Sequence, residues 1–230
     1  MKSIVSLAVL LACLSQAAVA GQSEKISAQA QAQSIHARAL VLDTHLDTPL
    51  LFARPGWDIM DRHSADADFS YVDYPRMVDG GLDGGFWAIW TAQGERDLAG
   101  KRKARDAGLR RLMDIREMVA AHRDHFEIAL RADDAQRIVN ADKRVVYISM
   151  ENASPLATDP SLLETYYALG LRMLGLVHSS NNDFADSATN PDGAEFGGLS
   201  DKGRALVADA NRLGLIVDLS HSSNDTFDQV

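Results

Sequence analysis

Short apolar runs alternate with longer helical stretches along most of the chain. Six runs have the length of a β-strand, at residues 39–42, 84–90, 126–130, 144–150, 171–177 and 215–219. Nearly continuous apolar runs that are rich in β-branched residues are typical of strands buried on both faces of a parallel sheet. Residues 98–123 and 200–213 show helical spacing, and Ser200 and Gly214 suit the start and end of the second helix. The alternation predicts an α/β fold, and no internal linker divides residues 39–230.

The first twenty residues have the pattern of an export signal. A basic start at Met1–Ser3 precedes the apolar run Ile4–Leu14, which is too short to span a bilayer. Small residues at Ala18–Ala20 fit a signal peptidase site before Gly21. We therefore predict a signal peptide at residues 1–20, with a buried N-terminal helix as the alternative.

A second interpretation of the leader is lipidation, because Leu10–Cys13 is similar to a bacterial lipobox. The protein would then be a lipoprotein anchored through Cys13. If cleavage follows Ala20 instead, the mature chain has no cysteine, and an exported protein without disulfides indicates the bacterial periplasm. After the leader, residues 21–38 are predicted to form a polar linker and a helix around Ala28–Arg38.

The chain is acidic, with a net charge of −9 and a pI of about 5.2. This balance argues against nucleic acid and anionic membranes as partners, because both bind basic patches. Seven histidines accompany a single cysteine. A metal in this protein would therefore be held by imidazole and carboxylate groups rather than by thiolates.

Metal-binding residue types follow four of the six apolar runs. They are His45 and Asp47 after the first run, Glu151 after the fourth, His178 after the fifth and His221 after the sixth. The carboxyl ends of parallel strands meet on one face of a (β/α)8 barrel, where active sites are built. The spacing of His45 and Asp47 directs both side chains the same way past a strand end.

Each of these residues also has an ordinary structural interpretation. His45 is typical of a hydrogen-bonded strand-end histidine, Glu151 of a carboxylate at a helix start, and His221 of a turn residue. Their coincidence at four strand ends favours a metal centre. Trp87 and Trp90, within the second run, are expected to lie in the core, and His63 in a solvated loop.

Five segments together resemble the ordered motifs of the membrane (renal) dipeptidase family, peptidase family M19, in a bacterial form. They are Val41–Asp47, Ser149–Ala153, Gly175–His178, Gly198–Gly203 and Val217–His221. The resemblance implies a (β/α)8 TIM-barrel metal-dependent hydrolase, of which residues 39–230 would supply only the first five or six βα units.

The resemblance also implies two zinc ions, for which manganese or cobalt would be substitutes. By this correspondence His45 and Asp47 bind the first zinc, Glu151 bridges both ions, and His221 binds the second. A hydroxide shared between the two ions would attack the peptide bond.

The substrate implied by the resemblance is a small dipeptide, including dipeptides with a C-terminal D-residue. His178 would polarise the scissile carbonyl rather than bind metal, and Asn181 or Asn182 would contact the substrate. A homodimer is kept as an open alternative to a monomer.

Two departures from the family pattern stand out. Many relatives carry Gly-Gly after the bridging glutamate, where this chain has Asn152 and Ala153. The family also has a further zinc-binding histidine, a substrate-binding arginine and an aspartate beyond the position of His221. None of these precedes Val230, so the chain is expected to be a C-terminally truncated form.

Two other functions are consistent with the residues. One is another binuclear amidohydrolase that acts on a cyclic amide or lactone, since such enzymes share the His-x-Asp pattern at the first strand. The other is an inactive relative that binds a metal or a peptide without turnover.

Overall fold

The computed structural model describes residues 27–230, which fall into two compact units divided after Val41. In the first unit, residues 27–36 form a helix, which confirms the prediction for Ala28–Arg38 with an end two residues earlier. The predicted signal peptide and Cys13 lie outside the described residues. No helix within residues 27–230 combines the length and the apolar character needed to cross a bilayer.

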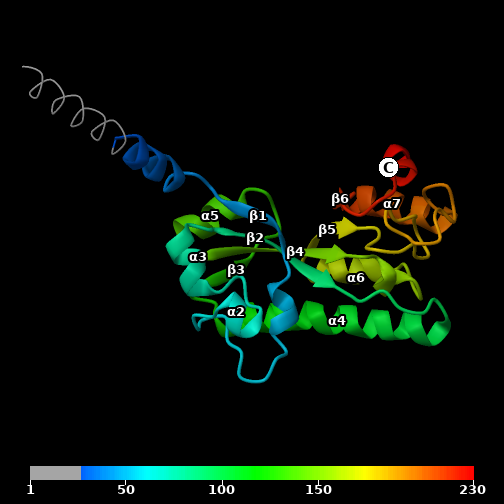
Figure 1. Cartoon of the computed structure of the whole chain (residues 1–230), viewed down its shortest axis with the longest axis horizontal. Helices are drawn as coiled ribbons and strands as arrows, with labels where there is room; N and C mark the ends of the chain where they lie inside the picture. The colour runs from blue at the N-terminus through cyan, green and yellow to red at the C-terminus, as the bar shows by residue number, and fades with distance from the viewer. Residues whose placement is uncertain (1–26) are drawn as a thin grey trace, which may run out of the picture. The chain divides into compact units, whose positions relative to one another are not determined.

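The second unit, Leu42–Val230, is built on one parallel sheet (Figure 1). Its strands are β1 (Leu42–Leu46), β2 (Gly84–Trp90), β3 (Phe126–Ile128), β4 (Arg144–Glu151), β5 (Leu171–Gly175) and β6 (Ile216–Asp218). Their order is β1-β2-β4-β5-β6, and every neighbouring pair is parallel. The sheet forms half of a barrel, which confirms the predicted partial (β/α)8 architecture.

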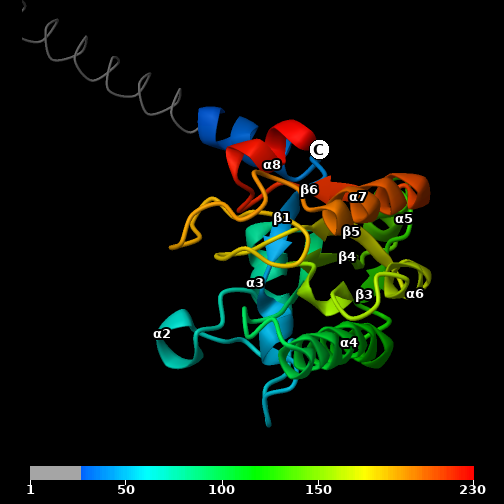
Figure 2. The same ribbon diagram turned by 90° about the vertical axis from the view of Figure 1, so that its right-hand side faces the viewer.

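Helices follow most of the strands. They are η1 (Thr48–Leu51), α2 (Ala65–Asp68), α3 (Tyr74–Gly80), α4 (Leu98–Ala121), α5 (Asp134–Asn140), η2 (Ser154–Leu156), α6 (Leu162–Ala168), α7 (Asp201–Leu213) and α8 (Asn224–Gln229). Helix α4 packs against β2 and β3, α6 against β5, and α7 against β6, so the three flank one side of the strands (Figure 2). The caps predicted for α7 are confirmed, because the Ser200 side chain accepts from Gly203 N and Gly214 is left-handed.

The first predicted strand differs from the structure in its position and the third in its pairing, whereas the other four differ by at most two residues at either end. The first was expected at residues 39–42, whereas β1 spans Leu42–Leu46 and includes polar residues. Its pairing explains the shift, because β1 lies against the glycines that begin β2, and a Cβ at Gly85 would come within 2.2 Å of Asp43 O. The third predicted strand exists, but β3 pairs only with the first three residues of β4 and lies off the main path of the sheet.

Alternate side chains of β4 lie on opposite faces of the sheet, one face in the apolar core and the other toward Glu151. Val146, Ile148 and Met150 belong to the main apolar cluster that the sheet forms with its helices. Tyr147 belongs to a second, smaller cluster, and alternation puts Glu151 on the same face as Tyr147. The strand is buried along nearly its whole length, so Glu151 emerges from a rigid element.

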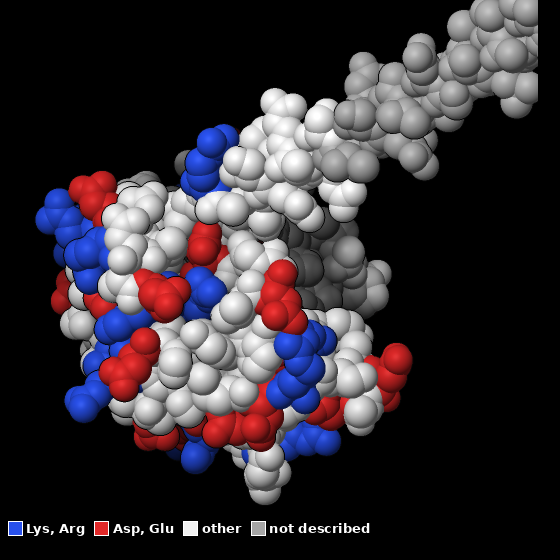
Figure 3. Space-filling view, turned by 90° about the vertical axis from the view of Figure 1, so that its left-hand side faces the viewer, with Lys and Arg blue, Asp and Glu red and all other residues white. Residues whose placement is uncertain are grey.

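The surface seen in Figure 3 carries acidic and basic side chains interspersed rather than gathered by sign. Ion pairs join neighbouring elements. For example, Glu127 of β3 pairs with Arg137 of α5 and with Lys143. Exposed pairs of this kind contribute little to stability, about 0–1 kcal/mol each. On the face seen in Figure 3 the acidic chain shows no strong patch of one sign.

Candidate metal centre

Glu151 lies at the centre of the site. It is the last residue of β4, and only 10% of its side chain is exposed. Its Oε2 lies 3.3 Å from His45 Nε2, and its Oε1 lies 3.0 Å from His221 Nε2. The two carboxylate oxygens therefore face two different sets of partners, which is the geometry of a bridging ligand.

The first set comes from the end of β1. His45 Nε2 lies 3.3 Å from Asp47 Oδ1, and the His45 amide donates to the Asp43 carboxylate at 2.9 Å. Leu46 faces the apolar core, so alternation sends His45 and Asp47 together to the opposite face. The ligand atoms of His45, Asp47 and Glu151 all lie within 4.8 Å of one another.

The second set comes from the loops after β5 and β6. His221 and His178 face each other with ring centroids 4.4 Å apart, and His178 Nε2 lies 3.5 Å from Glu151 Oε1. His221 has a φ of +66°, which is uncommon without glycine, and its carbonyl accepts from Ala188 N. The loop after β5 therefore holds His221 in the conformation that aims its ring at Glu151.

Trp90 corrects one sequence prediction. It was expected in the core, as Trp87 is, but it is only half-buried and its ring meets the His178 ring edge-on at 6.0 Å. Alternation along β2 explains the difference, because Trp87 faces the helices whereas Trp90 faces the side that carries the site. Trp90 thus packs against His178 of the candidate centre, a contact that the apolar pattern did not predict.

The donor groups suit a metal ion such as zinc. Tetrahedral ligands about 2.0–2.1 Å from one Zn²⁺ lie about 3.3 Å from each other, close to the 3.0–3.3 Å separations between the histidine nitrogens and the carboxylate oxygens. Imidazole and carboxylate groups are the ligands that zinc shares with manganese and cobalt. The groups open into a pocket of about 620 Å³, which has room for ions and a small substrate.

Electrostatics within the first set favour a cation. Two hydrogen bonds of His45 raise the pKa of its imidazole to about 10, the larger effect coming from Asp47 and the smaller from Glu151. Partial burial opposes the rise. The hydrogen bond from His45 in turn lowers the pKa of Asp47. Without metal, a proton on His45 thus supplies the positive charge that these carboxylates require.

In metal-free protein, His45 is expected to keep its proton through neutral pH. Because the folded pKa of about 10 exceeds the ordinary value of about 6.5, this charge stabilises the fold fully below pH 6.5. The contribution is lost as pH rises toward 10. The His45 side chain is 37% exposed, so solvent screening limits the loss to about 1 kcal/mol.

NMR titration of the His45 ring in the presence of chelator checks the pKa, with His45→Gln to assign the signal. Urea unfolding between pH 6 and 10 checks the stability, and His45→Gln should flatten this part of the profile. A His45 midpoint near 6.5 would contradict the expected pairing.

The two candidate substrate-binding asparagines lie beside the centre rather than in it. Asn181 donates to Gly193 O at 2.8 Å and accepts from Ser187 N at 2.8 Å, which ties the loop after β5 to itself. Asn182 is almost completely buried. Neither lines the pocket that holds Glu151. Their contact with substrate stays a prediction.

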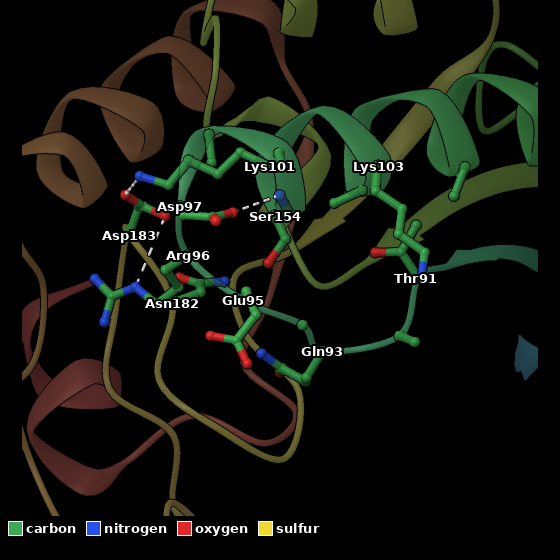
Figure 4. Close-up of a pocket in the computed structure, with 17 residues that line it drawn as sticks. Thr91, Gln93, Glu95, Arg96, Asp97, Lys101, Lys103, Ser154, Asn182 and Asp183 are labelled. Atoms are coloured by element: carbon green, nitrogen blue, oxygen red, sulfur yellow. Dashed lines mark hydrogen bonds and ion pairs between the residues drawn. The ribbon is translucent and has the colours of Figure 1, made fainter.

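A second pocket of about 510 Å³ lies at the start of α4, between the segments that follow β2 and β5 (Figure 4). Thr91, Ser154 and Asn182 line it, together with charged groups such as Lys101, which pairs with Asp183. None of the five site residues lines this pocket. This pocket is therefore separate from the one that holds Glu151.

Asp186 is a residue that sequence reasoning missed. Its buried carboxylate accepts from the backbone N–H groups of Glu195, Phe196 and Gly198, and its carbonyl accepts from Ser223 N and Thr226 Oγ1. These bonds tie the long loop after β5 to the segment that follows His221. A lone aspartate in a polar loop carries no spacing signal, so only the structure reveals this role.

Comparisons with known proteins agree with this geometry. The family model for membrane dipeptidase (peptidase family M19) matches residues 29–230. Dipeptidase tcpJ of Claviceps purpurea is 32% identical over 173 residues, which cover 73% of this chain and 40% of that protein.

Two solved structures are similar. The probable dipeptidase PvdM from Pseudomonas aeruginosa matches with a TM-score of 0.78 and 29% identity, over 86% of this chain and 51% of that one. A metallopeptidase from Rhodobacter sphaeroides, solved with a phosphinate mimic of the dipeptide L-Ala-D-Ala, matches with a TM-score of 0.70 and 28% identity. That match covers 82% of this chain and 60% of the other.

The chain thus spans about half the length of the relatives it matches. The family model nevertheless covers nearly all of the described residues, including every member of the Glu151 cluster. This chain belongs to the membrane dipeptidase family, peptidase family M19.

Proposed function

We propose that this chain carries the metal centre of a zinc dipeptidase that cleaves small dipeptides, including those with a C-terminal D-residue. The observation that carries the proposal is the position of Glu151, whose two oxygens face His45 and His221 at 3.3 and 3.0 Å. His45 and Asp47 would hold one ion and His221 the other, with Glu151 shared between them.

Two ions bound there would supply Lewis acidity and a water nucleophile that is activated near neutral pH. The chain's own residues supply the geometry. Glu151 projects from a buried strand and fixes the distance between the two ligand sets. His45 must lose its proton for its nitrogen to act as a ligand, so metal binding at this set releases a proton.

His178 has a separate role in this proposal. It is the most distant of the three histidines from Glu151, at 3.5 Å, and its Nδ1 lies 3.2 Å from Ser179 Oγ. An imidazole beside the shared carboxylate could donate a hydrogen bond to the carbonyl oxygen of a bound dipeptide. Such a donor stabilises the negative charge that develops on this oxygen in the transition state.

The substrate class rests on the relatives. The similar Rhodobacter sphaeroides metallopeptidase was solved with a mimic of L-Ala-D-Ala, and the curated relatives are named dipeptidases. The pocket of about 620 Å³ is consistent with a small ligand.

The direct test is an assay of the protein, expressed with every residue that its gene encodes, on L,L- and L,D-dipeptides. Release of the C-terminal amino acid should require zinc, stop with chelator and fall at least about 100-fold in His45→Ala. His122→Ala is the matched control, because His122 caps α4 and pairs with Asp58 away from the centre.

The substrate range decides between the alternatives. Turnover of a cyclic amide or lactone without turnover of any dipeptide would overturn the proposal in favour of another binuclear amidohydrolase. Zinc binding without any turnover would indicate the inactive, metal-binding relative.

A further inference from the structure

The residue after Glu151 adopts a backbone conformation that few side chains tolerate. Asn152 has a φ of +75° at the point where β4 ends and the chain turns into η2. Asparagine is one of the few residues other than glycine that visits this region. This position thus requires a residue that tolerates a left-handed backbone, and the chain meets the requirement with a side chain that can also form hydrogen bonds.

The Asn152 side chain joins three segments. Completely buried, it donates to Thr91 O after β2 at 3.2 Å and accepts from Ser154 Oγ of η2 at 2.7 Å. Its Oδ1 also accepts from Asn182 Nδ2, on the loop after β5, at 3.1 Å. Figure 4 shows Thr91, Ser154 and Asn182 projecting from these three segments.

Asn182 completes the connection. Its Nδ2 also donates to Leu176 O at 2.7 Å, and its Oδ1 accepts from Phe184 N and Ala185 N at 2.8 and 3.2 Å. An amide group has two N–H donors and two lone pairs on its oxygen, so every hydrogen-bonding position of Asn182 is occupied. Asn181 forms one bond through each end of its amide and keeps a spare donor for a ligand.

We propose that the Asn152–Asn182 amide pair positions Glu151, and that Asn182 acts through this pair rather than by contact with substrate. The inference rests on the proposed metal centre. Glu151 must present one oxygen to each ligand set, which fixes the direction in which its backbone leaves β4. The amide pair fixes Asn152, the residue after Glu151, to the segments that follow β2 and β5. The pair therefore holds the backbone from which the Glu151 carboxylate projects.

The test is calorimetric titration with Zn²⁺ of the wild type and three variants. Asn182→Ala removes the link, and Asn152→Gly keeps the left-handed backbone but loses every side-chain bond. Both should bind Zn²⁺ at least about 10-fold more weakly, because groups that orient a metal ligand typically contribute 10–100-fold to affinity. Asn140→Ala, which removes an exposed amide that accepts from Gln136 on α5, should bind within about twofold of the wild type.

A second measurement separates positioning from general stability. In a dipeptide assay, Asn182→Ala should lower kcat while KM stays within about twofold, because the substrate keeps its own contacts. Lower melting temperatures with unchanged zinc affinity in both Asn182→Ala and Asn152→Gly would overturn the inference and leave the proposed function intact. A wild type that binds no zinc would overturn both, so the two failures are distinguishable.

Discussion

Replacing Glu151 by glutamine is expected to abolish tight zinc binding and dipeptidase activity together. The carboxylate is shared by His45, His178 and His221, all within 3.5 Å of its oxygens. A neutral amide of the same size removes the negative charge and replaces one acceptor oxygen with an N–H₂ donor that faces a ligand set. Glu151 is the buried member of these pairs, and removing the charge of a buried, paired carboxylate typically costs about 3–5 kcal/mol, or about 10²–10⁴-fold in an equilibrium constant.

The measurements are calorimetric zinc titration and kcat/KM on one dipeptide, each compared with Glu164→Gln. Glu164 of α6 forms an exposed pair with Arg212 of α7, so its change should alter neither quantity by more than about twofold. If Glu151→Gln retained two zinc ions with unchanged affinity, Glu151 would not be the bridging ligand.

The location of the candidate site could be predicted from sequence because the ends of the strands are recognisable as the points where apolar runs stop. Each run that ends in a charged or imidazole side chain proved to be a strand whose carboxyl end faces the centre, and parallel order brings those ends together. The alternation of side chains along β1 and β4 then decides that His45 and Glu151 share a face. A site whose residues are positioned by the two-residue alternation of a strand can therefore be predicted from the order of residues alone.

The supports of the site could not be predicted in the same way. Asn152 and Asp186 act through bonds to segments far along the chain, such as Thr91 and Gly198, which no local spacing encodes. The left-handed φ of His221 likewise depends on a carbonyl bond to Ala188. β1 began three residues later than its apolar pattern indicated because its pairing with glycines of β2, rather than hydrophobicity, fixes its bounds.

The contact between Gly203 and the backbone of Phe184 gives a stability prediction, because it too joins segments that no local spacing encodes. Gly203 lies in the first turn of α7, and a Cβ there would come within 1.9 Å of the carbonyl oxygen of Phe184. That oxygen is backbone of a buried residue and already accepts from Ser200 N, so it has little freedom to move.

Gly203→Ala is therefore expected to destabilise the protein by about 3 kcal/mol, the upper end for overpacking, and to lower Tm by about 6–12 °C. The shift of α7 away from Phe184 would also disturb the turn that Asn182 holds through Phe184 N, so zinc affinity should fall with stability. Gly80→Ala, where a Cβ meets nothing within 4 Å, is the control and should change Tm little or raise it slightly. Thermal unfolding of both variants checks the expectation, and equal Tm values would show that α7 can move aside without cost.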